Sequence, residues 1–416
     1  MGKLTIEYIL WYKQRNPTKR FSAGRASDQT MCVIAVATEQ IPYQYLAYKF
    51  RLLPNRKQHA DLARILEDQR QLYNGALEAR ISRYRKTGET LSHYAMCKQL
   101  TELRNEDGFS TTPVKLQRWT LRRLDKTYRA FLTRMRRGLK AKFPRYRGKG
   151  QWQSFGFEEF DGIRLKANRI HFKGMSGGLR VHMHRALPNG AKVVACTIGR
   201  DRKGWFVAFQ TRVCPIQFCA TGSHVGIDLG LKNLCFLSSG ELIPNPQIGR
   251  RHERELRRRQ RSLSRCMRDS KRRAKVRQAV TRIHAKIKDT RSTYLHQVSA
   301  KLVREHDVIA IEKLNTKGLA SGMLAKSVNN AAWSILKHNL IYKAAYAGRQ
   351  VIEVDPRNTT QACSGCGVIV PKDLSMRMHD CPHCGLSLDR DHNAAINILN
   401  RAVMRPGFAN LPCVAA

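Results

Sequence analysis

Residues 224–243 read HVGIDLGLKNLCFLSSGELI, and this stretch determines the fold class of the C-terminal half of the chain. Its apolar runs are separated first by a tight turn and then by a Ser-Ser-Gly turn signal at 238–240. This pattern predicts a strand, a tight turn, a second strand, a turn and a third strand. Asp228 lies in the first of these strands.

The elements predicted downstream extend this sheet. Residues 307–314, DVIAIEKL, are almost wholly apolar, which predicts a short strand buried on both faces. A helix near 331–347 precedes another predicted buried strand in QVIEVDP, 350–356, and a last helix in NAAINILNRAV, 393–403. Three strands, helix, strand, helix, strand, helix is the order of a ribonuclease H-like α/β fold. Here a cysteine-rich segment interrupts it before the last helix.

A strand and a helical part are predicted near the start of the chain. Residues 44–54 alternate aromatic and basic side chains, which predicts a strand. Residues 55–140 have helical apolar spacing, with a first helix closed by Gly88, a second capped by Ser92 and a third that starts after Pro113. Two interpretations stay open for this helix-turn-helix-like bundle: an ordinary solvated bundle, or a helical clamp on nucleic acid.

Residues 141–220 predict a small antiparallel β-barrel, because short alternating runs are separated by Gly and Asn turns. Within them, residues 142–157 interleave Lys and Arg with aromatic rings. These rings are either barrel core or a surface on which bases stack between phosphate contacts. The rings belong to Phe143, Tyr146, Trp152, Phe155 and Phe157.

The composition indicates a polyanionic partner. The chain of 416 residues is 42% hydrophobic, which excludes a disordered polycation, and 76 Lys and Arg against 31 Asp and Glu give a formal net charge of +45. Such an excess destabilises a compact fold through self-repulsion unless a polyanion neutralises it, and nucleic acid is the expected one. No apolar run approaches the roughly 20 residues needed to span a bilayer.

The positive charge is densest in a predicted basic helical insert at 250–305. A charge run of this kind is usually a solvated helix face, but its density here favours contacts to phosphates. The candidate nucleic-acid-binding residues, from this insert and from the aromatic segment, are Arg145, Arg147, Arg257, Arg258, Arg259, Arg261, Arg272 and Arg273.

Four of the 12 cysteines form two Cys-x-x-Cys pairs, separated by 14 residues. This is close to the spacing of four-cysteine zinc sites. Four thiolates fill the tetrahedral coordination of Zn2+ and leave no position for water, so the predicted zinc is structural. The other eight cysteines form no framework, which favours a reducing cytoplasm over a secreted disulfide scaffold. The predicted ligands are Cys363, Cys366, Cys381 and Cys384.

Three acids lie at the ends of predicted elements: Asp228 in the first strand, Glu312 at the end of the fourth and Asp391 at the start of the last helix. In a ribonuclease H-like sheet the first and fourth strands are neighbours, so these carboxylates gather and repel one another unless divalent cations neutralise them. Oxygen ligands suit Mg2+ or Mn2+, and two such ions clamp the attacking water and the leaving oxygen of a phosphodiester.

Several alternatives stay open around the third acid. Asp389 competes with Asp391, which is preferred because it leads directly into the small residues that permit close helix packing. Asn393 bonds either the backbone or a metal-bound water, and Arg390 either contacts phosphate or pairs internally. The predicted zinc ribbon at 361–386 is an insertion that fixes the start of the helix carrying this acid.

Together these residues resemble the TnpB (OrfB) family, which is encoded by bacterial insertion sequences and related to compact type V CRISPR effectors. The resemblance rests on GIDLG, AIEKL, the two Cys-x-x-Cys-Gly knuckles and DRDHNAAINI, and extends weakly to YKFRLLPN and KFPRYR. It departs from the family at the first 40 or so residues and at Thr360, where Ser is expected.

The resemblance implies an RNA-guided endonuclease with structural zinc, catalytic Mg2+, a guide RNA from the transposon end and double-stranded target DNA, acting as a monomeric ribonucleoprotein. It places the nuclease acids at Asp228, Glu312 and Asp391. Its implied parts are a recognition lobe (55–140), a wedge barrel (44–54 and 141–220), a RuvC-like nuclease domain (221–360 and 387–404) and the ribbon. Two alternatives remain: a guided binder that does not cut, and a guide-independent DNA-binding accessory protein of transposition.

The ends of the chain are the least informative parts. Residues 1–43 show no sustained periodicity and represent either a flexible extension or upstream codons, with Met31 as the true start. Residues 405–416 are expected to form a tail.

Overall fold

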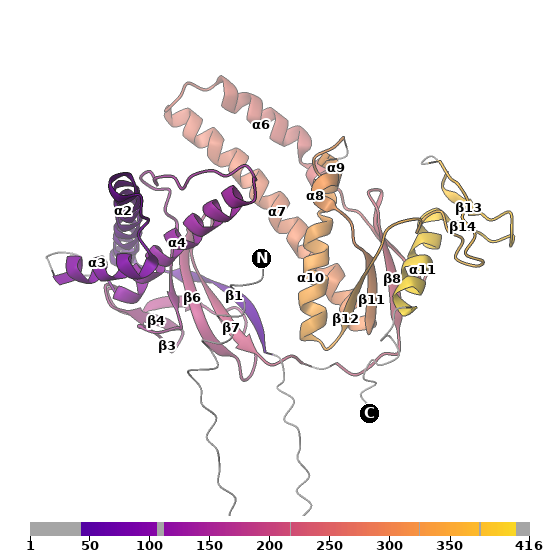
Figure 1. Ribbon diagram of the computed structural model, residues 1–416, viewed down its shortest axis with the longest axis horizontal. Coiled ribbons are helices and arrows are strands. Elements are labelled where there is room, and N and C mark those ends of the chain that lie inside the picture. Colours follow the sequence, from indigo (N-terminus) through magenta and orange to yellow (C-terminus); the bar gives the residue numbers. More distant parts are fainter. Residues whose placement is uncertain (1–42, 106–111, 217, 324, 374–375, 405–416) are drawn as a thin grey trace, which may run out of the picture. The chain divides into compact units, whose positions relative to one another are not determined.

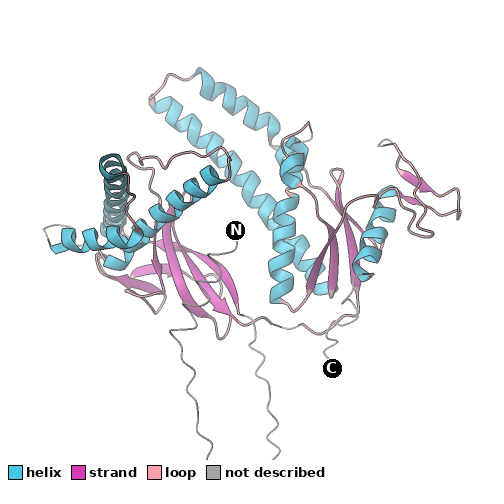
Figure 2. Cartoon of the chain, in the orientation of Figure 1, coloured by secondary structure: helices cyan, strands magenta, loops and turns pink. Residues whose placement is uncertain are grey.

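The structure is a computed structural model, and it describes residues 43–105, 112–216, 218–323, 325–373 and 376–404. Nearly all of the expected N-terminal extension, and the whole of the tail, lie outside these residues. The described chain contains a seven-stranded sheet, a five-stranded sheet and a two-stranded ribbon (Figures 1 and 2). None of the described helices combines the length and apolar character needed to cross a membrane.

The seven-stranded sheet is antiparallel, with the order β2-β6-β7-β1-β5-β4-β3. Phe155 and Phe157 on edge strand β2 contact Phe172 on β4, so the sheet curls until its far strands share one core. The sheet is therefore nearly closed, which comes close to the barrel that the sequence predicted. Its strands are β1 (Gln44–Leu53), β2 (Ser154–Glu158), β3 (Ile163–Lys166), β4 (Arg169–Phe172), β5 (Leu179–His182), β6 (Lys192–Asp201) and β7 (Gly204–Val213).

Three helices, α2 (Arg56–Thr87), α3 (His93–Asn105) and α4 (Val114–Arg136), follow β1, as the apolar spacing predicted. Asn55 begins α2 with a capping box, and Gly88 ends it with φ of 72°, a conformation that favours glycine. The predicted cap of α3 is present, since Ser92 Oγ accepts from the Ala95 backbone N–H.

The aromatic rings of residues 142–157 divide into two groups. Trp152, Phe155 and Phe157 are buried in the core of the sheet, whereas Phe143 and Tyr146 are 42% and 49% exposed. The barrel-core interpretation therefore holds for the first three rings. Only the two exposed rings are placed where a base could stack on them.

The five-stranded sheet has the order β10-β9-β8-β11-β12. β8 and β11 are parallel neighbours, as predicted, and every residue of β11 is buried. The prediction that QVIEVDP is a fully buried strand is wrong: β12 is an edge strand and most of its residues are half-buried. The strands are β8 (His224–Leu229), β9 (Asn233–Leu237), β10 (Leu242–Pro244), β11 (Val308–Glu312) and β12 (Gln350–Val354).

Helices cover both faces of this sheet. Residues of α7 and α10 share a core with Ile309 and Ile311 on one face, and Ile398 of α11 packs with Ala310 on the other. Figure 1 shows α10 and α11 on opposite sides of β8, β11 and β12. The helices are α5 (Ile248–Arg251), α6 (Glu253–Arg265), α7 (Lys271–Glu305), α8 (Thr316–Leu319), α9 (Ala325–Ala331), α10 (Trp333–Tyr346) and α11 (Arg390–Val403).

The basic insert is a helical hairpin, which the continuous helical pattern of the sequence did not predict. Helix α6 ends at Arg265 and α7 begins after Ser270, whose hydroxyl caps it. Arg273 closes the turn, because its guanidinium donates to the carbonyls of Leu263 and Cys266, both at 3.0 Å.

Strand β8 and helix α11 approach each other closely at Gly226. A Cβ atom at this position would lie 2.1 Å from the carbonyl oxygen of Ala395 and 2.7 Å from the backbone nitrogen of Leu399. Because these are backbone atoms, only a displacement of the helix could relieve the clash. The glycine of the GIDLG motif therefore permits the packing that brings α11 onto the strand carrying Asp228.

We expect Gly226→Ala to destabilise this sheet by about 3 kcal/mol, because it forces apart two packed backbones. Thermal denaturation followed by circular dichroism measures the effect. Gly75→Ala in α2 is the matched control: nothing lies within 4 Å of its added Cβ, so a neutral or slightly stabilising change is expected. A Gly226→Ala protein that melts with the wild type would contradict the close approach.

Candidate active site and metal centre

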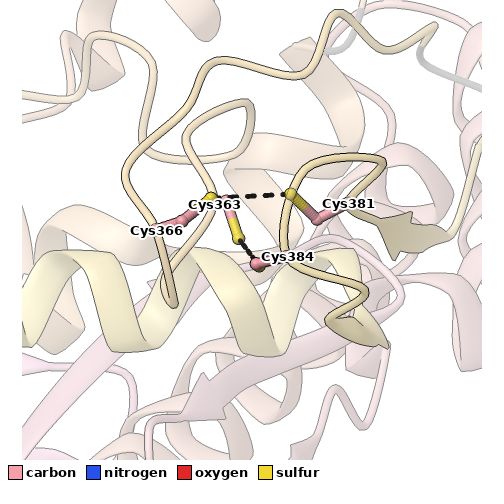
Figure 3. A group of neighbouring side chains, drawn as sticks. All are labelled: Cys363, Cys366, Cys381 and Cys384. Carbon is pink, nitrogen blue, oxygen red and sulfur yellow. Dashed lines mark hydrogen bonds between the residues drawn. The ribbon is translucent and has the colours of Figure 1, made fainter.

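The four predicted zinc ligands meet in the ribbon formed with β13 (Met378–Asp380) and β14 (Ser387–Asp389) (Figure 3). Their sulfur atoms all lie within 4.8 Å of one another, and the Cys363–Cys384 and Cys366–Cys381 pairs are each 3.6 Å apart. Each knuckle turns through a glycine with positive φ, Gly367 at 77° and Gly385 at 72°.

This donor set fits zinc. Four sulfurs placed tetrahedrally at the Zn–S distance of about 2.3 Å lie about 3.8 Å from one another, close to the observed pairs. The backbone N–H of Cys384 lowers the pKa of Cys381 to about 6, which favours the thiolate that a metal binds. The pKa of Cys384 is raised instead, because the lowering by the Leu386 backbone N–H is outweighed by hydrogen bonds with the other sulfurs. All four positions are filled by protein, so this centre has a structural and not a catalytic geometry.

The predicted acids come from three elements that pack together near the carboxyl ends of strands β8 and β11. Ile227 of β8 is paired with Ile311 of β11 in parallel register, so the residues that follow them, Asp228 and Glu312, lie at the same level of the two strands. Asp391 lies in the first turn of α11, which packs on both strands.

The three predicted acids influence one another electrostatically. Burial, followed by the charges of Glu312 and Asp391, raises the pKa of Asp228 to about 8, and Arg390 partly opposes the rise. Burial also raises the pKa of Glu312, an effect that a hydrogen bond from Thr359 opposes. A carboxylate that resists ionisation beside two others is a site that a cation would stabilise.

The three acids are less closely gathered than the cysteines. Among the described residues, the cysteines form the only group of three or more His, Cys, Asp or Glu side chains whose ligand atoms all lie within 4.8 Å of one another. The donor set of Asp228, Glu312 and Asp391 consists of oxygens alone, which suits Mg2+ or Mn2+ and not zinc. Its chemistry therefore fits the predicted cations.

The structure separates the roles of the residues around the third acid. Asp389 is the N-cap of α11, and its carboxylate accepts from the backbone N–H of Asp391. The Arg390 guanidinium lies 3.5 Å from the Asp391 carboxylate, an internal pairing. Asn393 bonds the backbone, since it accepts from the Ser364 N–H and donates to a carbonyl of the ribbon segment.

Three residues near this site were missed by the sequence analysis. The Thr359 hydroxyl contacts Glu312, Asn397 binds the Thr359 carbonyl, and the ring of His392 stacks on Phe236 of β9 at 5.2 Å between centroids. Nothing in the local sequence distinguishes Thr359 from Thr360 beside it. Only their burial does, because Thr359 is 1% exposed.

Four of the six predicted arginines of the insert line a groove of about 850 Å³ at the α6–α7 hairpin, and Arg259 is not among them. Arg257, Arg258, Arg261 and Arg272 line it, together with Arg254 and Arg265. Arg273 instead closes the hairpin turn through backbone carbonyls. Of the two predicted residues outside the insert, Arg147 places its guanidinium 5.8 Å from the ring of Tyr73.

Three protein families match parts of the chain. "Probable transposase" (OrfB_IS605) matches residues 216–322, "Cas12f1-like, TNB domain" matches 333–398, and "Helix-turn-helix domain" matches 44–89. Over the last range the structure has strand β1 and the single helix α2, not two helices.

A "Putative RNA-guided DNA endonuclease" of Streptomyces pristinaespiralis is 33% identical over 361 residues, which cover 85% of this chain and 88% of that protein. The chain belongs to the TnpB (OrfB) family. A second TnpB-family relative, "Putative RNA-guided DNA endonuclease InsQ" of Escherichia coli (strain K12), is 26% identical and covers 88% of this chain and 93% of its own.

The fold is shared with a solved structure described as "Cryo-EM structure of the Cas12f1-sgRNA-target DNA complex". Its TM-score is 0.54, with 15% sequence identity and 83% of each chain covered. At this identity the likeness concerns the fold alone. It agrees with the family match of residues 333–398 to a Cas12f1-like domain.

Proposed function

We propose that this protein is an RNA-guided, Mg2+-dependent DNA endonuclease encoded by an insertion sequence. The observation that carries the proposal is the convergence of Asp228, Glu312 and Asp391 at the carboxyl ends of the parallel pair β8 and β11, where burial, followed by the charges of Glu312 and Asp391, raises the pKa of Asp228. The named activity of two TnpB-family relatives and the net charge of +45 support it. The reaction is hydrolysis of a DNA phosphodiester.

The three carboxylates are the proposed catalytic residues and hold Mg2+ or Mn2+ through oxygen. Two such ions activate water and stabilise the leaving oxygen of a phosphodiester. The chain itself fixes the geometry: the β8–β11 register sets Asp228 level with Glu312, and the Asp389 cap orients the first turn of α11 with Asp391. Four cysteines hold a structural Zn2+ outside this centre.

The domain assignments belong to the same proposal. Residues 221–360 and 387–404 form a ribonuclease H-like, RuvC-like nuclease domain, interrupted by the zinc ribbon at 361–386. Residues 55–140 form a recognition lobe, and residues 44–54 with 141–220 form a wedge sheet. The order β10-β9-β8-β11-β12, with helices on both faces, supports the first assignment.

The proposed partners are a guide RNA from the transposon end and double-stranded target DNA, in a monomeric ribonucleoprotein. Pairing with a guide explains the charge well, because an RNA and a heteroduplex present phosphates along much of the protein while the bases select the sequence. The arginines that line the α6–α7 groove are the proposed phosphate contacts of the insert.

Sequencing of the RNA that co-purifies with the protein, expressed together with the DNA downstream of its gene, tests this function. We expect one discrete RNA that ends in transposon-adjacent sequence, and cutting of a plasmid that matches its guide portion. Scrambling the guide portion is the control and should abolish cutting. A heterogeneous mixture of host RNA without programmable cutting would instead support a guide-independent accessory protein, and programmed binding without cutting would support an inactive binder.

A further inference from the structure

One buried hydroxyl contacts one of the proposed catalytic carboxylates. Thr359 is 1% exposed, and its Oγ1 lies 2.5 Å from Oε1 of Glu312, which is itself 8% exposed. The contact joins residues 47 positions apart in the chain, so the fold and not the local sequence creates it. Thr359 lies in the loop between β12 and the first cysteine knuckle.

The loop that carries Thr359 is bound to the helix that carries Asp391. Asn393 and Asn397 are one turn apart on α11 and present their amides to the same side. Asn397 Nδ2 donates to the Thr359 carbonyl at 2.9 Å, and both amides donate to the Ala362 carbonyl, at 2.7 and 2.8 Å. Asn393 Oδ1 accepts from the Ser364 N–H inside the first knuckle, at 2.9 Å. One set of hydrogen bonds thus joins the cysteine centre, the helix and the loop.

The hydroxyl of Thr359 has one proton and two acceptors within reach. Besides Glu312 Oε1, the Pro356 carbonyl lies 3.1 Å from Oγ1. The carboxylate is the nearer of the two, and a charged acceptor forms the stronger bond. When the proton is donated to Oε1, that oxygen and the rotation of the carboxyl group are fixed. Oε2 is then the oxygen free to bind a cation.

We propose that Thr359 is a positioning residue of the catalytic centre. It holds the Glu312 carboxylate in the orientation in which a divalent cation is bound together with Asp228 and Asp391. This inference rests on the proposed function, and it deepens that function by assigning an outer-shell hydrogen bond to one of the three acids. Such partners of metal ligands fix orientation, and their loss typically lowers metal affinity or activity about 10- to 100-fold.

The test compares Thr359→Val, Thr359→Ser and Thr360→Val in the complete ribonucleoprotein. Valine keeps the shape of threonine but cannot donate, serine keeps the hydroxyl, and Thr360 is a half-buried neighbour. Cleavage rates are measured against Mg2+ concentration. A second readout is independent of DNA cutting: Fe2+ with ascorbate and peroxide produces radicals that break the polypeptide beside a bound ion, and mass spectrometry locates the breaks.

For Thr359→Val we expect the half-saturating Mg2+ concentration, and the Fe2+ concentration for breaks near residues 228, 312 and 391, to rise about tenfold or more. Thr359→Ser should stay within about threefold of the wild type, because it retains the donor. Thr360→Val should match the wild type. Zinc content and melting temperature, measured for all three variants, show whether the fold is retained.

Unchanged metal dependence in Thr359→Val, or an equal shift in Thr360→Val, would overturn the positioning role. A valine variant that loses zinc or unfolds would also count against it, because Thr359 would then act on the fold; the serine variant separates the hydroxyl from the packing in that case. Glu312→Gln distinguishes an error in the proposed active site from an error in the role of Thr359. If that variant still cuts DNA and still shows the Fe2+ breaks, the proposed active site is wrong whatever Thr359 does.

Discussion

Asp228→Ala is expected to abolish target cutting while guide RNA and target DNA stay bound. Removing one of the three carboxylates that would hold the cations should forfeit several kcal/mol of transition-state stabilisation, which corresponds to a rate loss of roughly 10³-fold or more. The proposed phosphate contacts lie elsewhere, on arginines such as those of the α6–α7 groove. Single-turnover cleavage and a gel-shift assay with the same ribonucleoprotein measure the two effects separately.

The fold should survive this substitution. Burial, followed by two neighbouring carboxylates, raises the pKa of Asp228 from 3.8 to about 8. Without divalent cations the unfolded chain therefore ionises this group while the folded protein keeps it protonated, and the free energy of unfolding falls as the pH rises between these values. Asp228→Ala and Asp228→Asn remove this loss of stability. At pH 7 in metal-free buffer both variants should therefore melt at or above the wild-type temperature, which excludes unfolding as the cause of lost cutting.

Asp389→Asn is the matched control for the acids, because asparagine is also a good helix N-cap. It should cut like the wild type, whereas Asp391→Asn should not. Persistent cutting by Asp228→Ala would remove the active-site assignment. If Asp389→Asn stopped cutting while Asp391→Asn remained active, the third catalytic acid would be Asp389 and not Asp391.

Removal of zinc is expected to destabilise the C-terminal part and to stop cutting. Structural Zn2+ contributes on the order of 10 kcal/mol of apparent binding free energy in small zinc domains, most of which appears as folding free energy. Here the loss of stability would extend from the ribbon to α11, because hydrogen bonds of Asn393 and Asn397 join the ribbon segment to this helix, which carries Asp391. Chelation, or Cys381→Ser, should lower the melting temperature and the zinc content together.

Cys214→Ser is the control for the zinc experiment, because this exposed cysteine lies outside the cluster. It should retain zinc, stability and cutting. A melting curve that is the same with and without the metal would contradict a structural zinc. Retained cutting by a zinc-free protein would show that the helix start holds its place without the ribbon.

Much of the fold followed from short-range pattern. The almost wholly apolar run around Ile309 predicted a buried strand, because a strand covered on both faces consists mainly of apolar residues, and each residue of β11 is buried. The two Cys-x-x-Cys pairs predicted their cluster because two short knuckles can supply four thiolates to one ion. The first and fourth strands were expected to be neighbours, and Ile227 and Ile311 are paired in parallel.

Other features depended on contacts that no local pattern records. The turn between α6 and α7 lies in a basic stretch whose sequence pattern is helical throughout, so the pattern gives no sign of it. Contacts of Arg273 with the backbone carbonyls of Leu263 and Cys266 close this turn. The half-burial of β12 follows from its place at the edge of the sheet, which its apolar sequence does not reveal. The sequence also left Asp389 and Asp391 in competition.

By itself the sequence determined the order of the main strands, the metal-ligand spacing and the family, because these depend on periodicity and on residues close together in the chain. Tertiary structure alone decided which of two adjacent threonines contacts Glu312 and that Asp389 caps the helix. It also decided that Gly226 lies against the backbone of α11. The reason is physical: a hydrogen bond between residues 47 positions apart depends on how strand, loop and helix pack, and packing is a property of the whole fold.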